Sequence, residues 1–319
     1  MKQLDLPLDR PALSVIIPVH NGGAKFRQCL ASLTPAPLDI IVVANGDTDG
    51  SAQVAGAFGA QVIRLPEACG PAQARNAGAQ AAKGEVLLFL DADVSVLPDT
   101  LAQVTLEPGV AAVFGSYDDA PAETNFLSQY KNLFHHYVHQ TGRTEAATFW
   151  AGCGAIRRDV FLAVGGFDEK YRQPSIEDIE LGYRLRRAGY AIRLRKTLQV
   201  KHLKRWTVRS LLHADFWCRA VPWTELMQRD RQMLDDLNVT WAARVAVVLA
   251  YLGLLELFFA WWLALISLTA MFALHAGLLR FFVAKRGLGF AMATLPWLWF
   301  YNLYSGLGFV VGLVRHWTR

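Results

Sequence analysis

Cysteine is scarce in this sequence, and no motif groups the cysteines that are present. Cys29, Cys69, Cys153 and Cys218 lie far apart, with no CxxC pair and no histidine at zinc-finger spacing. This pattern argues against a disulfide framework and against a structural zinc site. We therefore expect four free thiols, most of them buried.

Several targeting and nucleotide-binding signals are also missing. Met1 to Arg10 contains no apolar run, so we expect no secretory signal, synthesis in the cytosol and a catalytic part that stays there. No GxGxxG follows the first predicted strand, and GxxxxGK[ST] occurs nowhere. These absences argue against a classical dinucleotide site and against a P-loop.

Charge is nearly absent from Ala242 to the end. In the whole sequence of 319 residues, 53% are apolar, which is more than is usual for a soluble protein. The stretch 245–279 contains no Lys or Arg. As one helix it would be about 52 Å long, against about 30 Å of bilayer hydrocarbon. We therefore expect two short spans, near 243–260 and 263–281, and a third apolar segment near 288–314.

The number of spans stays open at this point. Arg280, Lys285 and Arg286 should face the cytosol, since cationic residues are enriched on that side. Three spans would place Arg315 and Arg319 on the opposite side, whereas two spans and an interfacial or re-entrant segment would not. Pro296 is a candidate kink within the third segment.

Basic and aromatic residues alternate just before the apolar region. Residues 193–231 hold ten Lys or Arg against three acids, with Trp206, Trp217 and Trp223 among them. This composition favours an interfacial segment on anionic lipid over a solvated pair of basic helices. Nucleic-acid binding is disfavoured because the stretch leads directly into membrane-type sequence. We predict a catalytic domain over 1–203, an interfacial segment over 204–241 and a membrane domain over 242–319.

The first ninety residues alternate short apolar runs with helical stretches. Strands are predicted at 13–19, 40–43, 62–65 and 86–90, and helices at 25–33, up to Phe58 and at 71–82. Such a pattern predicts an α/β nucleotide-binding fold with a mostly parallel sheet covered on both faces. Ligands bind at the carboxyl ends of such strands. Polar clusters follow three of them: 20–22, 45–47 and 91–93.

Two acidic pairs are the candidate catalytic groups. Asp91 and Asp93, one residue apart after a buried strand, could bind a hard divalent cation, although aspartates also commonly begin loops. Glu177 and Asp178 begin a predicted helix, where Ser175 to Asp178 fits a capping box. A carboxylate held there could equally serve as a general base toward a sugar hydroxyl. Both interpretations of the second pair remain open.

Six segments in one order make the pattern more specific. They are Ser14-Val-Ile-Ile-Pro-Val19 with Asn21, Asn45-Gly-Asp-Thr-Asp-Gly-Ser51, Ala74-Arg-Asn-Ala-Gly78, Asp91-Ala-Asp93, Gly165-Gly-Phe-Asp-Glu169 and Glu177-Asp-Ile-Glu-Leu-Gly182. In this order they resemble family-2 glycosyltransferases of the GT-A fold, and the resemblance covers about residues 12–203.

The resemblance implies a role for each matching position. Asp91 and Asp93 would hold the ribose and Mg²⁺ or Mn²⁺, and His202 would approach the metal or the diphosphate unless it is simply a surface residue. Asp178 would be the base of an inverting displacement, with Glu177 beside it. Further donor-site residues would be Pro18, His20, Asn21, Asn45, Asp47, Arg75 and Ala92, and the sugar and acceptor region would include Gly152, Gly166, Phe167 and Asp168.

Two departures from the family pattern bear on substrates. Relatives usually carry two acids where this chain has Ala44 and Asn45, so a UDP sugar and a GDP sugar both remain possible donors. The segment 202–206 lacks the Gln of the Gln-x-x-Arg-Trp motif of processive members, which favours transfer of a single sugar. Arg219 and Trp223 could contact an acceptor phosphate or head group, or pack at the membrane interface.

The combined expectation is a metal-dependent, inverting glycosyltransferase at a bacterial-type inner membrane or its equivalent, with the catalytic part in the cytoplasm. It would use a nucleotide-sugar donor and a lipid or lipid-linked acceptor, and would bind no nucleic acid. Two alternatives remain. One is a processive polysaccharide synthase, and the other is a catalytically silent nucleotide-binding membrane scaffold, which the change at Ala44 and Asn45 favours.

Overall fold

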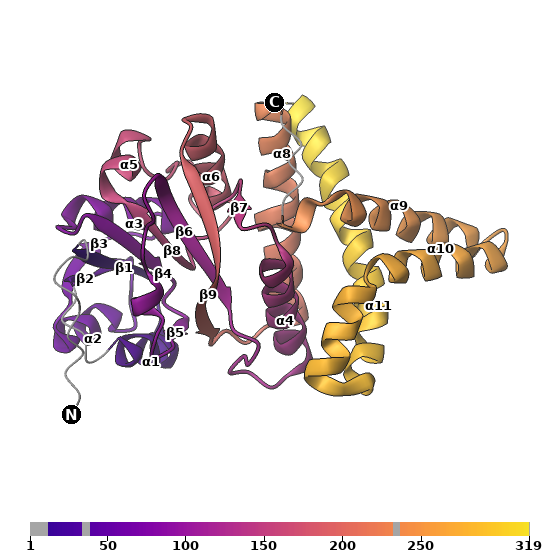
Figure 1. The fold of residues 1–319 in the computed structure, drawn as a ribbon, viewed down its shortest axis with the longest axis horizontal. Helices are drawn as coiled ribbons and strands as arrows, with labels where there is room; N and C mark the ends of the chain where they lie inside the picture. Colours follow the sequence, from indigo (N-terminus) through magenta and orange to yellow (C-terminus); the bar gives the residue numbers. More distant parts are fainter. Residues whose placement is uncertain (1–11, 34–38, 232–236, 319) are drawn as a thin grey trace. The chain divides into compact units, whose positions relative to one another are not determined.

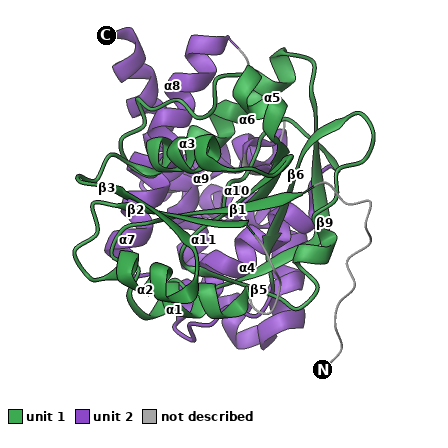
Figure 2. Cartoon of the chain, turned by 90° about the vertical axis from the view of Figure 1, so that its left-hand side faces the viewer, with its two compact units in different colours: residues 1–118, 144–204 green, residues 119–143, 205–319 purple. Residues whose placement is uncertain are grey.

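A computed structural model describes residues 12–33, 39–231 and 237–318, so the expectation for Met1 to Arg10 lies outside the described residues. The chain forms two compact units, drawn in different colours in Figure 2. Unit 1 contains residues up to 118 and 144–204, and unit 2 contains 119–143 and the chain from 205 onward. The predicted catalytic domain ran without interruption from 1 to 203, whereas the structure assigns 119–143 to the other unit.

Unit 1 is built on one sheet, whose strand order in the described residues is β3-β2-β1-β4-β8-β6-β9-β5, with β7 paired to β9. The strands are β1 (Leu13–Val19), β2 (Asp39–Asn45), β3 (Gln61–Leu65), β4 (Val86–Leu90), β5 (Val94–Val96), β6 (Val110–Tyr117), β7 (Glu145–Ala146), β8 (Cys153–Arg157) and β9 (Ala191–His202). Its helices are α1 (Gly23–Ser32), α2 (Ser51–Phe58), α3 (Pro71–Ala81), α5 (Arg158–Ala163), α6 (Glu177–Arg187) and the short η1 (Leu101–Gln103).

The parallel pairing predicted for the first four strands is confirmed, since β1 lies parallel to both β2 and β4, and β2 to β3. The sheet as a whole is mixed. Strand β8 runs antiparallel to β4 and β6, and β9 is antiparallel to β5 and β7 but parallel to β6. Through β8, this second half of the sheet lies beside β4, and Asp91 follows the end of β4.

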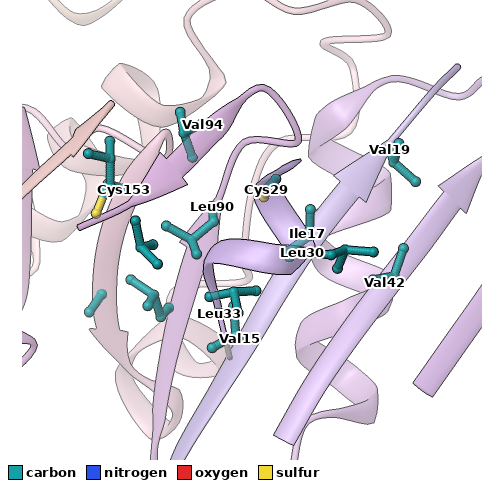
Figure 3. Close-up of a cluster of buried hydrophobic side chains, with 14 of the residues drawn as sticks. Val15, Ile17, Val19, Cys29, Leu30, Leu33, Val42, Leu90, Val94 and Cys153 are labelled. Carbon is teal, nitrogen blue, oxygen red and sulfur yellow. The ribbon is translucent and has the colours of Figure 1, made fainter. Parts of the chain in front are cut away.

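Alternating side chains of β1 enter different layers of the core. Val15, Ile17 and Val19 pack with Leu30 and other buried residues of α1 and the neighbouring strands (Figure 3). Gly78 of α3 lies against the opposite face, where an added Cβ would come 2.5 Å from Ile16 Cγ2. Both faces of the strand are therefore buried, and this explains its unbroken apolar sequence.

Unit 2 is helical in its described residues. It contains α4 (Phe126–Thr141), α7 (Val208–Leu212), the π-helical η2 (His213–Ala220), α8 (Val221–Asp230), the short η3 (Leu237–Val239), α9 (Trp241–Glu256), α10 (Trp261–Leu274) and α11 (Ala276–Trp317). Tyr130 and Leu133 of α4 pack in one cluster with Leu278, Phe282 and Leu298 of α11. This apolar contact accounts for the grouping of α4 with the C-terminal helices.

The apolar C-terminal region differs from the predicted set of spans. Helices α9 and α10 pack along each other as a hairpin (Figure 1), but their 16 and 14 residues are fewer than the about 20 that cross a bilayer. In the described residues, α11 alone is long and apolar enough to cross a membrane. Its backbone leaves the helical region at Gly287, whereas none of its non-helical torsion angles occurs at Pro296, the predicted kink.

All four cysteines are free, as predicted, but only Cys29 and Cys153 are buried, whereas Cys69 and Cys218 are half-buried. The expectation that most thiols are buried was therefore wrong for two of them. Burial, together with the nearby carboxylates of Asp93 and Asp91, raises the pKa of Cys29 to about 12. This thiol therefore stays protonated and unreactive beside the acidic strand end.

Candidate active site

The loops that follow β1 and β2 are hydrogen-bonded to each other. Asn21, with φ of 52°, accepts the Thr48 N–H on its Oδ1 at 2.8 Å. The His20 ring lies beside them, with Nδ1 2.8 Å from the carbonyl oxygen of Asn45. Asp47 accepts the N–H of Ala52 in the first turn of α2 at 3.1 Å. These residues therefore lie together at one sheet edge, next to half-buried Pro18 of β1.

Asn45, where relatives were expected to carry an acid, holds the next loop in place. Its Oδ1 accepts the N–H of Cys69 at 2.9 Å, and its Nδ2 donates to the carbonyl of Gly70 at 3.2 Å. Gly70 has φ of +92°, and an added Cβ would come 2.6 Å from the backbone of Arg172. The buried amide is thus used to shape the loop that leads into α3.

Arg75 of α3 joins the two acidic pairs. Its guanidinium donates to Asp91 Oδ1 and to Glu177 Oε1, each at 2.8 Å, and both Arg75 and Glu177 are buried. Burial alone would lower the pKa of Arg75, but the charges of Asp91, Glu177 and Asp178 raise it instead. The arginine therefore stays cationic and fixes the start of α6 beside the end of β4, although the two acidic pairs are far apart in sequence.

Asp178 is oriented by backbone donors. Its Oδ2 accepts the N–H of Ala151 at 3.1 Å, and its Oδ1 accepts the N–H of Ile179 at 2.8 Å. The predicted capping box is wrong, because the N-cap of α6 is Ile176, which makes no side-chain cap. Glu177 instead accepts the N–H of Ser175 at 2.9 Å while it binds Arg75. The carboxylates also lie at the positive end of the α6 dipole.

The turn at 165–168 is fixed from two helices. Asn76 of α3 accepts the N–H of Phe167 and donates to its carbonyl, each at 2.9 Å, and its Oδ1 lies 2.6 Å from the position of a Cβ added at Gly166. Arg184 of α6 donates to the carbonyl of Gly166 at 2.6 Å. The Phe167 ring is buried beneath Arg75, 5.5 Å from its Cζ, so it supports the arginine from below.

Asp168, the last predicted residue of this turn, is half-buried and pairs with Lys170 at 2.6 Å. Burial opposes its ionisation, but hydrogen bonds from Lys170 lower the pKa of Asp168 overall. The side chain therefore remains a carboxylate at neutral pH.

Asp93 and His202 form the second polar pair. His202 Nε2 lies 4.0 Å from Asp93 Oδ2, because β5 and β9 pair at Val94 and His202 and Leu203 donates to the Asp93 carbonyl. His202 is buried and stacks on Tyr117 with ring centroids 4.0 Å apart, so it is not the surface histidine of the alternative interpretation. No group of three or more metal-ligating side chains is assembled among the described residues.

The end of β4 is paired closely with the start of β8. The N–H of Asp91 donates to the carbonyl of Gly152 at 3.2 Å, with half-buried Ala92 next in the chain. The Trp150 ring packs so tightly over Gly152 that an added Cβ would come within 2.4 Å of it, and it meets Tyr117 edge to face.

Sequence reasoning missed Asn76, Tyr117 and Trp150 as site residues. Asn76 lay inside the quoted segment 74–78, which was the available signal, whereas the two aromatic residues lie in no motif. The predicted acceptor residues Arg219 and Trp223 belong to unit 2, where they line a cavity described below.

Gly182 allows α6 to approach the chain that orients Asp178. An added Cβ would come 2.5 Å from the nitrogen of Phe149, which is backbone and has little freedom to move. We expect Gly182→Ala to cost about 1–3 kcal/mol of stability by overpacking and to reduce activity. Gly56→Ala in α2 is the matched control, since nothing lies within 4 Å of its added Cβ. Thermal unfolding of both variants tests this, and equal stabilities would contradict it.

The sequence and the fold are similar to those of known glycosyltransferases. The sequence matches the family described as glycosyl transferase family 2 over residues 14–165, and the N-terminal domain of galactosyltransferase over 132–206. It is 39% identical over 105 residues to the uncharacterized glycosyltransferase YibD of Escherichia coli, which is 30% of either chain. It is 29% identical over 220 residues to the pre-mycofactocin glycosyltransferase of Mycobacterium tuberculosis, covering 63% of this chain and 46% of that protein.

The chain therefore spans less than half the length of these two relatives. Among solved structures, the mannosyltransferase PcManGT from Pyrobaculum calidifontis, in complex with GDP-Man and Mn²⁺, has a similar fold. Its TM-score is 0.59 at 19% identity, over 99% of this chain and 90% of that one. Residues 14–165 are thus a glycosyltransferase family 2 domain, within a mixed α/β fold of the GT-A type.

Proposed function

We propose that this protein is an inverting, metal-dependent glycosyltransferase that moves one sugar from a nucleotide-sugar donor to a lipid or lipid-linked acceptor at a membrane. The observation that carries the proposal is the buried Arg75, which binds both Asp91 and Glu177 at 2.8 Å. It joins a donor-side acid to the helix that bears Asp178. A half-buried carboxylate held beside a buried ion pair, as Asp178 is here, is more typical of a functional site than of a pair that only stabilises the fold.

The donor would lie over the carboxyl ends of β1, β2 and β4, where the loops containing His20, Asn21 and Asp47 meet. The fold relative that binds GDP-Man and Mn²⁺ supports a nucleoside diphosphate sugar as the donor class. Because the Asn45 amide is occupied by Cys69 and Gly70, base recognition would depend on backbone groups of this loop. Both UDP and GDP sugars therefore remain donors to test.

A divalent cation would be held by Asp93 and His202, with Asp91 beside them. The donors present fit Mn²⁺ or Mg²⁺: carboxylate oxygens suit both ions, and an imidazole nitrogen suits Mn²⁺ better. Asp91 Oδ1 is bound by Arg75, which makes Asp93 the more available carboxylate. When bound, the cation would neutralise the charge of the leaving diphosphate.

Asp178 would be the general base. Hydrogen bonds from Ala151 and Ile179 fix the carboxylate, which is the arrangement needed to remove a proton from an acceptor hydroxyl. Glu177 is buried and has one oxygen on Arg75 and the other on the N–H of Ser175. We assign it a positioning role.

Membrane association would depend on unit 2. The turn between α9 and α10 presents Phe258, Phe259, Trp261 and Trp262, each more than half exposed. Aromatic rings at the tip of an apolar hairpin suit partial insertion into a bilayer. Lys285 pairs with Asp119, and Arg286 donates to Gln129 and to the Asp119 carbonyl, which would keep this end of α11 outside the hydrocarbon. We propose that the catalytic unit is cytoplasmic and that the protein associates with an inner membrane or its equivalent.

The metal assignment is tested by thermal shift with UDP or GDP, with and without Mn²⁺ and a chelator. Mass action predicts that nucleotide and Mn²⁺ together stabilise the wild type. We expect Asp93→Ala to weaken this Mn²⁺-dependent binding at least about 10-fold, since even outer-shell changes around a metal cost that much. Asp99→Ala, in an exposed position nearby, serves as the control. Unchanged Mn²⁺ dependence in Asp93→Ala would remove the claim.

A further inference from the structure

Unit 2 contains a cavity of about 1430 Å³, larger than the about 300–1,000 Å³ of most small-molecule sites. All of its lining residues belong to unit 2, and they come from α4, η2, α8, α9 and α11, among other segments. The cavity therefore shares no residue with the donor and catalytic residues of unit 1, although the predicted acceptor residues Arg219 and Trp223 line it. It is also too large for a single ion or a small polar metabolite to fill.

The charged residues of the lining are mostly cationic. Lys131, Arg143, Arg219 and Arg244 line the cavity, and Asp215 is the one acid in the part of its lining that the structure describes. Asp215 is buried and bound to Lys131 at 2.5 Å and to the Tyr304 hydroxyl at 2.9 Å. The formal charges of the described lining residues, four cations and one acid, therefore sum to a net positive charge. This favours an anionic group.

A π-helical segment carries part of this lining. In η2 the turns are wider than in an α-helix, and both Asp215 and Arg219 line the cavity, with the arginine 4.0 Å from the carboxylate. π-Helical turns are rare and occur frequently at functional sites. The π-helical conformation is an observation separate from the charges of the lining residues, and it occurs in the same part of the lining.

The apolar part of the lining follows α9 away from the cations. Arg244 lies in the first turns of α9, over the ring of Trp241, and Val248, Leu252 and Leu255 follow along the same helix. From Arg244 to Leu255 is about 16 Å at 1.5 Å per residue. That length exceeds half of an about 30 Å hydrocarbon core. Figure 1 shows α9 running outward from α4 and α8 to the tip of the hairpin.

We propose that this cavity binds a phosphate-bearing lipid, with its head group at Arg219 and Arg244 and its hydrocarbon chain along α9. Arginine suits the head group because its guanidinium matches phosphate oxygens with two parallel hydrogen bonds. The exposed apolar side of α9 suits the chain. The proposal goes beyond the transfer reaction, since such a lipid binds whether or not sugar transfer takes place.

The test measures lipid binding to the full chain in detergent by native mass spectrometry, with phosphatidic acid, phosphatidylcholine and diacylglycerol as probes. We expect phosphatidic acid to bind at least about 10-fold more tightly than diacylglycerol, which lacks the phosphate, because charge-assisted hydrogen bonds are the strong ones. Arg244→Gln and Arg219→Gln should each reduce this preference several-fold. Val248→Trp should weaken both lipids together, since residue 248 lines the apolar part and is exposed.

Arg209→Gln is the matched control, a cation of the same unit that does not line the cavity. An equal loss in Arg209→Gln and Arg244→Gln would mean general surface attraction and would overturn the proposal. Equal binding of diacylglycerol and phosphatidic acid would also overturn the proposal. Displacement of phosphatidic acid by inorganic phosphate alone would overturn it too. Asp178→Asn should bind the lipid like the wild type, so that failure of the catalytic assignment and failure of this one remain distinguishable.

Discussion

Arg75→Ala should destabilise the protein by about 3–5 kcal/mol and abolish transfer, the largest combined effect we expect from a single substitution. The guanidinium is buried and neutralises Glu177, which is itself only 4% exposed. Without it, Glu177 would be a buried charge with no cation, and Asp91 and Asp178 nearby would add repulsion. Chemical unfolding in detergent, together with a transfer assay, measures both consequences.

Two further variants separate charge from geometry. Arg75→Lys keeps the positive charge, but the lysine ammonium group lacks the planar guanidinium that binds two carboxylates at once. We therefore expect only partial recovery of stability and little recovery of activity. Arg157→Ala is the control, because Arg157 also binds a carboxylate at 2.8 Å but is exposed, and exposed pairs contribute less than about 1 kcal/mol. A loss for Arg75→Ala no larger than that for Arg157→Ala would refute the proposed clamp.

Asp178→Asn should lower the rate of transfer by about 10²- to 10⁴-fold, the range of a general base. Stability should change little, since an amide oxygen can still accept the N–H of Ala151 that now binds Asp178. The readout is kcat of Asp178→Asn beside that of the wild type, measured with the correct donor.

Glu177→Gln provides the contrast within the same helix. It removes the charge that pairs with buried Arg75, so it should lose stability as well as activity, whereas Asp178→Asn should lose activity alone. If Asp178→Asn turned over at the wild-type rate, Asp178 would not be the base. If Glu177→Gln instead kept full stability and lost transfer to the extent expected of a missing base, the two roles would be exchanged.

Much of the nucleotide-binding half could be predicted because its signals are local. Strands β1 and β4 have the predicted bounds, and α3 ends one residue before its predicted end, since buried parallel strands are continuous apolar runs and Pro71 fixes the start of the helix. The convergence of polar residues at the strand ends also follows from topology. The antiparallel strands β5 and β7 were not predicted, because two or three residues carry no periodicity.

The contacts that organise the site were less accessible to prediction. Nothing local in the sequence says that Arg75 joins Asp91 to Glu177, because this link spans 102 residues. The capping pattern at Ser175 was misleading, since tertiary pairing of Glu177 with Arg75 replaces the local cap. The break at Gly287 needed φ of +83°, which glycine permits, whereas Pro296 appeared the stronger breaker by residue type.

The assignment of α4 to unit 2 has a consequence for synthesis of the chain. Tyr130 and Leu133 pack against Leu278 and Phe282, so 148 residues separate Tyr130 from Leu278. At ordinary elongation rates the ribosome needs about 7–30 s to make that length. During this interval the apolar face of α4 has emerged while its partners on α11 have not yet been made, so this cluster can form only after Leu278 and Phe282 have been synthesised.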